Sequence, residues 1–112
     1  MCALVEKLTG KTMLQFLDER IFSHLGCFKT AKMLKVNGGD SWGDSAMICT
    51  PRDLLTFARF VMNKGVWNGK RLMNEEYLTT ATSPLVSNLN NGHRAAFQYG
   101  YGYQFWMCKD GF

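Results

Sequence analysis

Residues 50–62 read TPRDLLTFARFVM and decide the fold of this chain. The stretch opens with a capping threonine, a proline at the first helical position and an acid at the third. Apolar residues then recur at i, i+3, i+4 and i+7 from Leu54 to Val61, and residues 63–65 (NKG) supply a stop. The sequence therefore predicts a buried amphipathic helix at this point in the chain.

Apolar residues at helical spacing predict three further helices, at residues 3–9, 12–26 and 74–81. The helix at 12–26 should begin at a capping box formed by Thr12 and Gln15, and the helix at 74–81 at Asn74. Gly10 and Gly26 are suited to end the helices at 3–9 and 12–26.

Turn residues and alternating patterns mark the rest of the chain. Asn68-Gly69 accepts the positive φ angles of a type I′ turn and predicts a tight hairpin. Residues 37–40 (NGGD) indicate a second turn, and residues 83–98 a polar loop. Residues 99–107 (YGYGYQFWM) alternate at period two, which predicts a strand.

Length and charge exclude several classes of protein. A chain of 112 residues allows one domain at most, and 46% hydrophobic with 20% charged residues is not typical of disorder. The net charge of +4 is scattered, and the small basic group of Lys29, Lys32 and Lys35 is interpreted as a solvated face. No nucleic-acid partner and no cofactor are therefore predicted.

The four cysteines lie far apart in the sequence. With no Cys-x-x-Cys pair and two histidines in the chain, a zinc site is not expected. Two disulfides or four thiols would both fit, and thiols are favoured because Cys27 and Cys49 have apolar neighbours. No apolar run reaches the length of a membrane span and no signal peptide is recognisable, so the compartment stays open, with the cytoplasm favoured.

Both ends of the sequence interrupt a pattern. The first helix is under way without a capping residue, and Asp110-Gly111 starts a hairpin that has no returning strand. We therefore expect residues 1–112 to be one partial domain, an internal segment of a larger one.

No catalytic motif of a serine enzyme occurs in the sequence. Ser-x-x-Lys, Gly-x-Ser-x-Gly and Tyr-x-Asn are all absent, and neither His24 nor His93 has an evident partner. Gly10-Lys11-Thr12 ends one helix and starts the next, so it is not interpreted as a phosphate-binding loop.

An ordered set of segments nevertheless resembles the serine β-lactamase-related family. This family includes class C β-lactamases, penicillin-binding DD-peptidases, esterases and 6-aminohexanoate-dimer hydrolases, and the last branch is the most similar. The segments that carry the resemblance are residues 4–10 (LVEKLTG), 16–22 (FLDERIF), 25–26 (LG), 44–54 (DSAMICTPRDL), 65–72 (GVWNGKRL), 75–77 (EEY), 81–83 (ATS) and 99–106 (YGYGYQFW).

The resemblance implies a helix-rich α+β fold: about four helices and a C-terminal strand of a partial β-lactamase/transpeptidase-like domain. It also implies a parent serine hydrolase that acts on a small amide, ester or peptide-like substrate through an acyl-enzyme. The family's three catalytic motifs fall before and after the matched segments, so no residue of this chain is expected to be catalytic. The chain alone is expected to be inactive.

Three residues are hypotheses for substrate contact. In the family, the residues that match positions 42–46 tend to lie at the rim of the substrate pocket, which suggests Trp42, Asp44 and Ser45. Ordinary turn chemistry is the competing interpretation of the Asp and Ser. The aromatic residues of 99–107 are interpreted mainly as core packing.

A rival hypothesis is a free-standing helical module that binds other proteins and has no catalysis. If the segment folds alone, we expect self-association through the exposed edges of the strand at 99–107.

Overall fold

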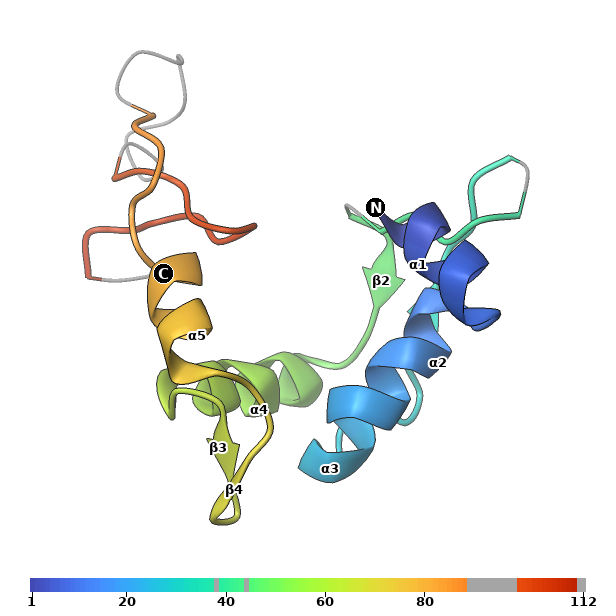
Figure 1. The fold of residues 1–112 in the computed structure, drawn as a ribbon, viewed down its shortest axis with the longest axis horizontal. Coiled ribbons are helices and arrows are strands. Elements are labelled where there is room, and N and C mark those ends of the chain that lie inside the picture. Colours follow the sequence, from blue (N-terminus) through green and yellow to red (C-terminus); the bar gives the residue numbers. More distant parts are fainter. Residues whose placement is uncertain (38, 44, 89–98, 111–112) are drawn as a thin grey trace.

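The computed structural model describes residues 1–37, 39–43, 45–88 and 99–110, and in that part of the chain four helical stretches accompany two small antiparallel sheets (Figure 1). The α+β class expected from the sequence is confirmed. The elements in chain order are α1 (Cys2–Thr9), α2 (Met13–Leu17), η1 (Asp18–Phe22), α3 (Ser23–Leu25), β1 (Lys32–Met33), β2 (Met47–Ile48), α4 (Pro51–Met62), β3 (Val66–Trp67), β4 (Lys70–Arg71) and α5 (Glu75–Ala81).

The predicted helix caps are confirmed. The Thr50 side chain accepts a hydrogen bond from the backbone N–H of Asp53, and the Asp53 carboxylate accepts one in return from the backbone N–H of Thr50. Thr12 and Gln15 form the same reciprocal box before α2, and Asn74 caps α5. These side chains satisfy amide donors that the first turn of a helix cannot pair internally.

The predicted helix at residues 12–26 contains a π-helical turn that the sequence did not indicate. The η1 segment runs continuously between α2 and α3, and the N–H of Ser23 donates to the carbonyl of Asp18, five residues earlier. The Ser23 hydroxyl donates to the same carbonyl at 2.7 Å. This wider turn precedes Leu25, which is buried together with Phe22, and Gly26 then ends the helix in the left-handed conformation.

Each of the two sheets consists of two short antiparallel strands. The predicted turn between β3 and β4 is confirmed, because Asn68 and Gly69 have φ angles of 46° and 78°, as a type I′ turn requires. The strands β1 and β2 pair Lys32 with Ile48 at the base of a longer hairpin, residues 32–48. Near its tip, the N–H of Val36 donates to the carbonyl of Asp40, which agrees with the turn predicted there, although Gly38 lies outside the described residues.

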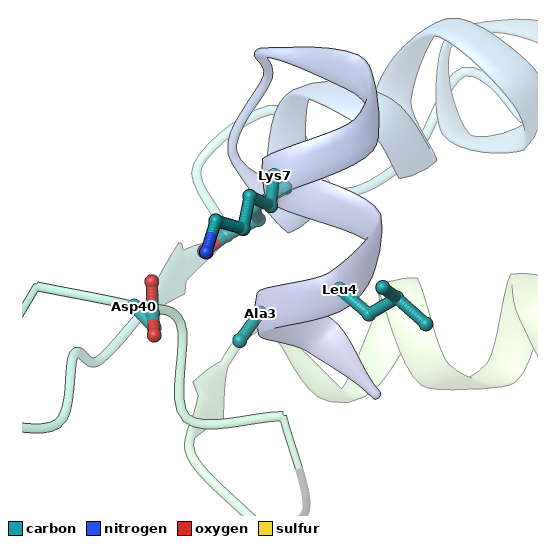
Figure 2. A pocket seen from close by; sticks show the side chains of 5 residues that line it. Ala3, Leu4, Lys7 and Asp40 are labelled. Carbon is teal, nitrogen blue, oxygen red and sulfur yellow. The ribbon is translucent and has the colours of Figure 1, made fainter.

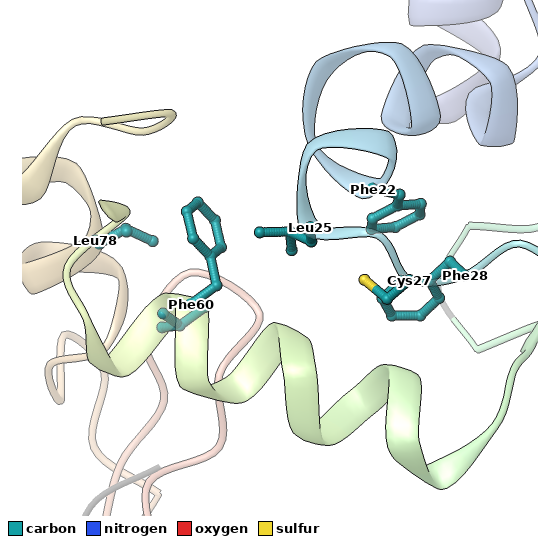
Figure 3. Close-up of a cluster of buried hydrophobic side chains, with 7 residues drawn as sticks. Phe22, Leu25, Cys27, Phe28, Phe60 and Leu78 are labelled. Carbon is teal, nitrogen blue, oxygen red and sulfur yellow. The ribbon is translucent and has the colours of Figure 1, made fainter. Parts of the chain in front are cut away.

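The hydrophobic core joins the α2–α3 stretch to α4 and α5 (Figure 3). Phe22 and Phe28 stack with ring centroids 4.1 Å apart, and Phe57 of α4 meets both rings edge-on. Phe60 is completely buried, between Leu25 on one side and Leu78 on the other. The helix predicted from residues 50–62 therefore packs in the core through Phe57, Phe60 and Val61, whereas Leu54, which its pattern placed on the buried face, is exposed.

The predicted strand at residues 99–107 is wrong. The segment reverses on itself: Tyr101 pairs with Trp106, and the N–H of Gly102 donates to the carbonyl of Phe105 at 2.8 Å. Gly100 and Gln104 have φ angles of 110° and 65°, which extended strand residues do not adopt. The segment also pairs with the chain after α5, because Tyr101 and Val86 exchange backbone hydrogen bonds at 2.9 and 3.1 Å. The long exposed strand that was expected to mediate self-association therefore does not form.

Of the aromatic residues in this reversed segment, Phe105 packs against the core, whereas three others contact one another or α5. Tyr101 and Trp106 contact each other at 4.8 Å between ring centroids, and Tyr103 contacts Tyr77 at 5.9 Å. Tyr103 and Trp106 stay exposed, so core packing is the wrong interpretation for these two. Gly102 is fixed by close contact, because a Cβ there would lie 2.0 Å from the carbonyl oxygen of Ala81.

The cysteines are thiols, as the sequence favoured. Cys27 is buried in the core and Cys49 packs against it. Burial, followed by the nearby Asp53 carboxylate, raises the pKa of the Cys27 thiol above its ordinary value. Cys27 is therefore an apolar packing residue rather than a reactive thiolate.

We expect Phe60→Ala to lower the free energy of unfolding by about 3–5 kcal/mol, because it leaves a cavity where α4 meets α3 and α5. Leu54→Ala is the matched control on the same helix, since Leu54 is 57% exposed and should lose less than about 1 kcal/mol. Urea denaturation followed by circular dichroism measures both changes. Equal losses in the two variants would contradict this description of the core.

Candidate functional site

A cavity of about 500 Å³ lies where α1, the start of α2 and the hairpin of residues 32–48 meet. Its volume is within the range of small-molecule sites, and most of its lining is apolar. The lining residues are Met1, Cys2, Ala3, Val5, Met13, Val36, Asp40, Ser41, Trp42, Gly43 and Gln104. We call it the Trp42 cavity.

The Trp42 side chain forms one wall and is 45% exposed. The backbone N–H of Trp42 donates to the carbonyl of Leu34 at 2.8 Å, which fixes this part of the hairpin. An indole held in this way offers a flat apolar surface to a ligand.

The Glu6 carboxylate connects the three elements that surround the cavity. Its Oε1 accepts hydrogen bonds from the Ser41 hydroxyl at 2.5 Å and the Met13 N–H at 2.6 Å, while its Oε2 accepts one from the Ser41 N–H at 3.1 Å. The Ser41 hydroxyl, then its backbone N–H, the Met13 N–H and the charge of Lys35 lower the pKa of Glu6. Glu6 thus holds Ser41, and with it the neighbouring Trp42, against α1.

Ser41 and Glu6 do not form a nucleophile–base pair. Ser41 is 8% exposed, so a substrate carbonyl has little access to its hydroxyl. A carboxylate whose pKa is lowered by three donors is also a weaker base than an ordinary glutamate. The contact is structural.

Gly43 permits a close approach between the hairpin and α1. A Cβ at this position would lie 1.8 Å from the Cys2 sulfur, so no larger residue fits without movement. Cys2 and Gly43 both line the Trp42 cavity.

A second depression lies on the neighbouring face of α1 (Figure 2). Ala3, Leu4, Glu6, Lys7 and Asp40 line it, so it shares Ala3 and Asp40 with the Trp42 cavity. Lys7 and Asp40 approach it from α1 and from the hairpin, whereas Leu4 points away from Asp40. Glu6 is already occupied by its three hydrogen bonds, so this depression has fewer groups to offer a ligand.

The structure places one of the three sequence-predicted residues in the Trp42 cavity. Trp42 lines it, Ser45 is exposed and is not among the lining residues, and Asp44 lies outside the described residues. The sequence missed Gln104, Met13 and Val36, which come from separate segments. No local pattern marks them, because only the fold brings them together.

Ser23, Ser83 and His24 do not assemble a catalytic site. The hydroxyls of Ser23 and Ser83 donate to backbone carbonyls, and His24 is exposed at the end of α3. His93 lies outside the described residues. Within the same residues, no three side chains of His, Cys, Asp or Glu gather as metal ligands.

None of the described helices has the length and apolar character needed to cross a membrane. The chain matches no family model, and a search of curated proteins finds no significant match.

We expect Glu6→Gln to reduce the loss of folding stability at acidic pH. The folded pKa of Glu6 is lowered, so its stabilising effect is present above the unfolded pKa and is lost as the pH falls through about 4 and below. Thermal unfolding between pH 7 and pH 3, followed by tryptophan fluorescence, measures this effect.

The wild type should lose more stability than Glu6→Gln over that interval. Glu76→Gln is the control, because Glu76 is an exposed α5 residue away from this site. Identical pH profiles for wild type and Glu6→Gln would show that the three hydrogen bonds to Glu6 do not stabilise the site.

Proposed function

We propose that this chain is an internal part of a serine hydrolase domain of the β-lactamase-related type, and that it forms a wall of the substrate pocket. The observation that carries the proposal is the Trp42 cavity: the residue suggested by the resemblance lines a largely apolar cavity of suitable size. The catalytic serine and its base lie outside this chain in the proposal.

The surface of the chain supports a larger domain. Helix α1 has no buried residue, and large apolar side chains on α1 and α4 are exposed. In the proposed domain, further layers of structure would cover these side chains.

The reaction would be acyl transfer from an amide or ester to water. The serine attacks the substrate carbonyl, the leaving amine or alcohol departs, and water then releases the acyl group from the serine. Trp42 would pack against the apolar part of the substrate and hold its carbonyl near the serine. Glu6 and Ser41 would keep the Trp42 loop in position.

We expect Trp42→Ala, made in the full-length gene product that contains this chain, to lower kcat/KM for p-nitrophenyl butyrate about tenfold, mainly through KM. Leu55→Ala is the control, since Leu55 is 62% exposed on α4 and does not line the cavity. Steady-state kinetics with both variants tests the role of Trp42. An unchanged KM in Trp42→Ala, or an equal effect in Leu55→Ala, would refute it.

The exposed side of α4 favours a second candidate function, a helical module that binds another copy of the chain. Leu54, Ala58 and Met62 follow one another at i, i+4 and i+8 and form one apolar ridge, and Leu54 and Met62 are exposed. The core face of α4, which includes Phe57, Phe60 and Val61, lies beside this ridge on the helix surface. The apolar surface of α4 is therefore wider than the core covers, and the ridge needs a cover of its own.

For this second candidate, we expect the isolated chain to form dimers and Met62→Glu to make it monomeric, since the charge would be buried in the contact. Leu34→Glu is the control, because Leu34 is an exposed apolar residue outside α4. Sedimentation velocity over a concentration series distinguishes them. A wild-type chain that stays monomeric at its solubility limit would exclude the module.

A further inference from the structure

Gln104 reaches the Trp42 cavity from a distant part of the chain. It lies in the turn of the reversed segment that follows α5, whereas the other lining residues all belong to residues 1–43. Its carboxamide is the polar group that the C-terminal part of the chain contributes to a mainly apolar wall. Ligand sites commonly combine such a wall with a few well-placed polar groups.

The backbone of Gln104 adds a second, independent observation. Its φ angle is 65°, at the third position of the turn closed by Gly102 and Phe105. Glycine or asparagine is the residue that such a position favours, because a Cβ is strained there. A glutamine at this position has a conformational cost, and strained residues concentrate at functional sites.

The hydrogen bonding of the side chain decides what it can offer a ligand. The Tyr101 hydroxyl donates to Oε1 of Gln104 at 3.2 Å. This bond leaves one lone pair on Oε1, and the Nε2 amide can offer its N–H donors to a ligand. An amide donor beside an indole surface suits a neutral molecule that has a carbonyl oxygen next to an apolar group.

We propose that Gln104 is a specificity-determining residue, which donates a hydrogen bond from Nε2 to a carbonyl oxygen of a neutral amide or ester whose apolar group packs on Trp42. The reaction in which such a ligand would be consumed rests on the proposed function. The recognition itself needs only residues of this chain.

The test is an NMR titration of the ¹⁵N-labelled chain with N-benzylacetamide, which has the carbonyl, and with butylbenzene, which lacks it. We expect N-benzylacetamide to shift the Trp42 indole and Gln104 carboxamide signals together, and to bind more tightly than butylbenzene. The Trp42→Phe variant assigns the indole signal. Equal binding of the two compounds, or no shift of the Gln104 carboxamide, would overturn the proposal.

Two substitutions separate recognition from folding. Gln104→Glu replaces the donor by a charged acceptor and should weaken N-benzylacetamide binding about tenfold. Gln104→Gly removes the strain and should keep or raise Tm while it also loses the affinity. Asn63→Asp, the same change of amide to acid at the exposed end of α4, should leave binding unchanged.

Retained affinity in both Gln104 variants would contradict the assignment, even if the cavity binds ligand. Failure of the proposed function is distinguishable from this result. Gln104-dependent binding by the chain, together with a full-length product that hydrolyses no acyl substrate, would leave the recognition site in place and remove the hydrolase.

Discussion

The Asp53 carboxylate is the interaction on which the arrangement of the helices depends. Its Oδ2 accepts hydrogen bonds from the Thr50 N–H at 2.9 Å and the Thr50 hydroxyl at 2.6 Å, which start α4. Its Oδ1 accepts one from the N–H of Phe28 at 2.7 Å, 25 residues earlier in the chain. One carboxylate therefore both caps the central helix and fixes the segment that follows α3. The same bonds, led by the Thr50 hydroxyl, lower the pKa of Asp53.

The hydrogen bond between Phe28 and Asp53 also positions an aromatic ring in the core. Phe28 has a φ angle of 60°, an unfavourable conformation for a bulky residue, and the bond to Asp53 helps hold it there. In that conformation its ring stacks on Phe22 and meets Phe57 of α4. Glu6 acts in the same way at the other end of the helical stretch, where it joins α1, α2 and the hairpin around the Trp42 cavity. Two carboxylates thus position the core and the candidate site.

The helix caps and the tight turn were predictable from the sequence because each depends on residues that are close together in the chain. The caps at Thr12, Thr50 and Asn74 and the turn at Asn68-Gly69 each depend on residues within a few positions of one another, and all are confirmed. The reversal at residues 99–107 was missed because its alternating pattern is that of a strand. The close contact of Gly102 with α5 and the positive φ of Gln104 depend on tertiary structure.

The candidate site was predictable only in part, for the same reason. Trp42 was identified through the resemblance, but the Glu6–Ser41 contact spans 35 residues and Gln104 joins the cavity from farther away. A local repeat of apolar residues cannot indicate a contact between residues so far apart in the sequence.

We propose that this chain supplies a substrate wall to a hydrolase whose nucleophile lies elsewhere. The most direct measurement is to label the full-length gene product with a fluorophosphonate and to identify the modified residue by peptide mass spectrometry. The account predicts one phosphonylated serine outside residues 1–112 and no adduct within them. An adduct on a serine of these 112 residues, or no adduct anywhere in the full-length product, would contradict it.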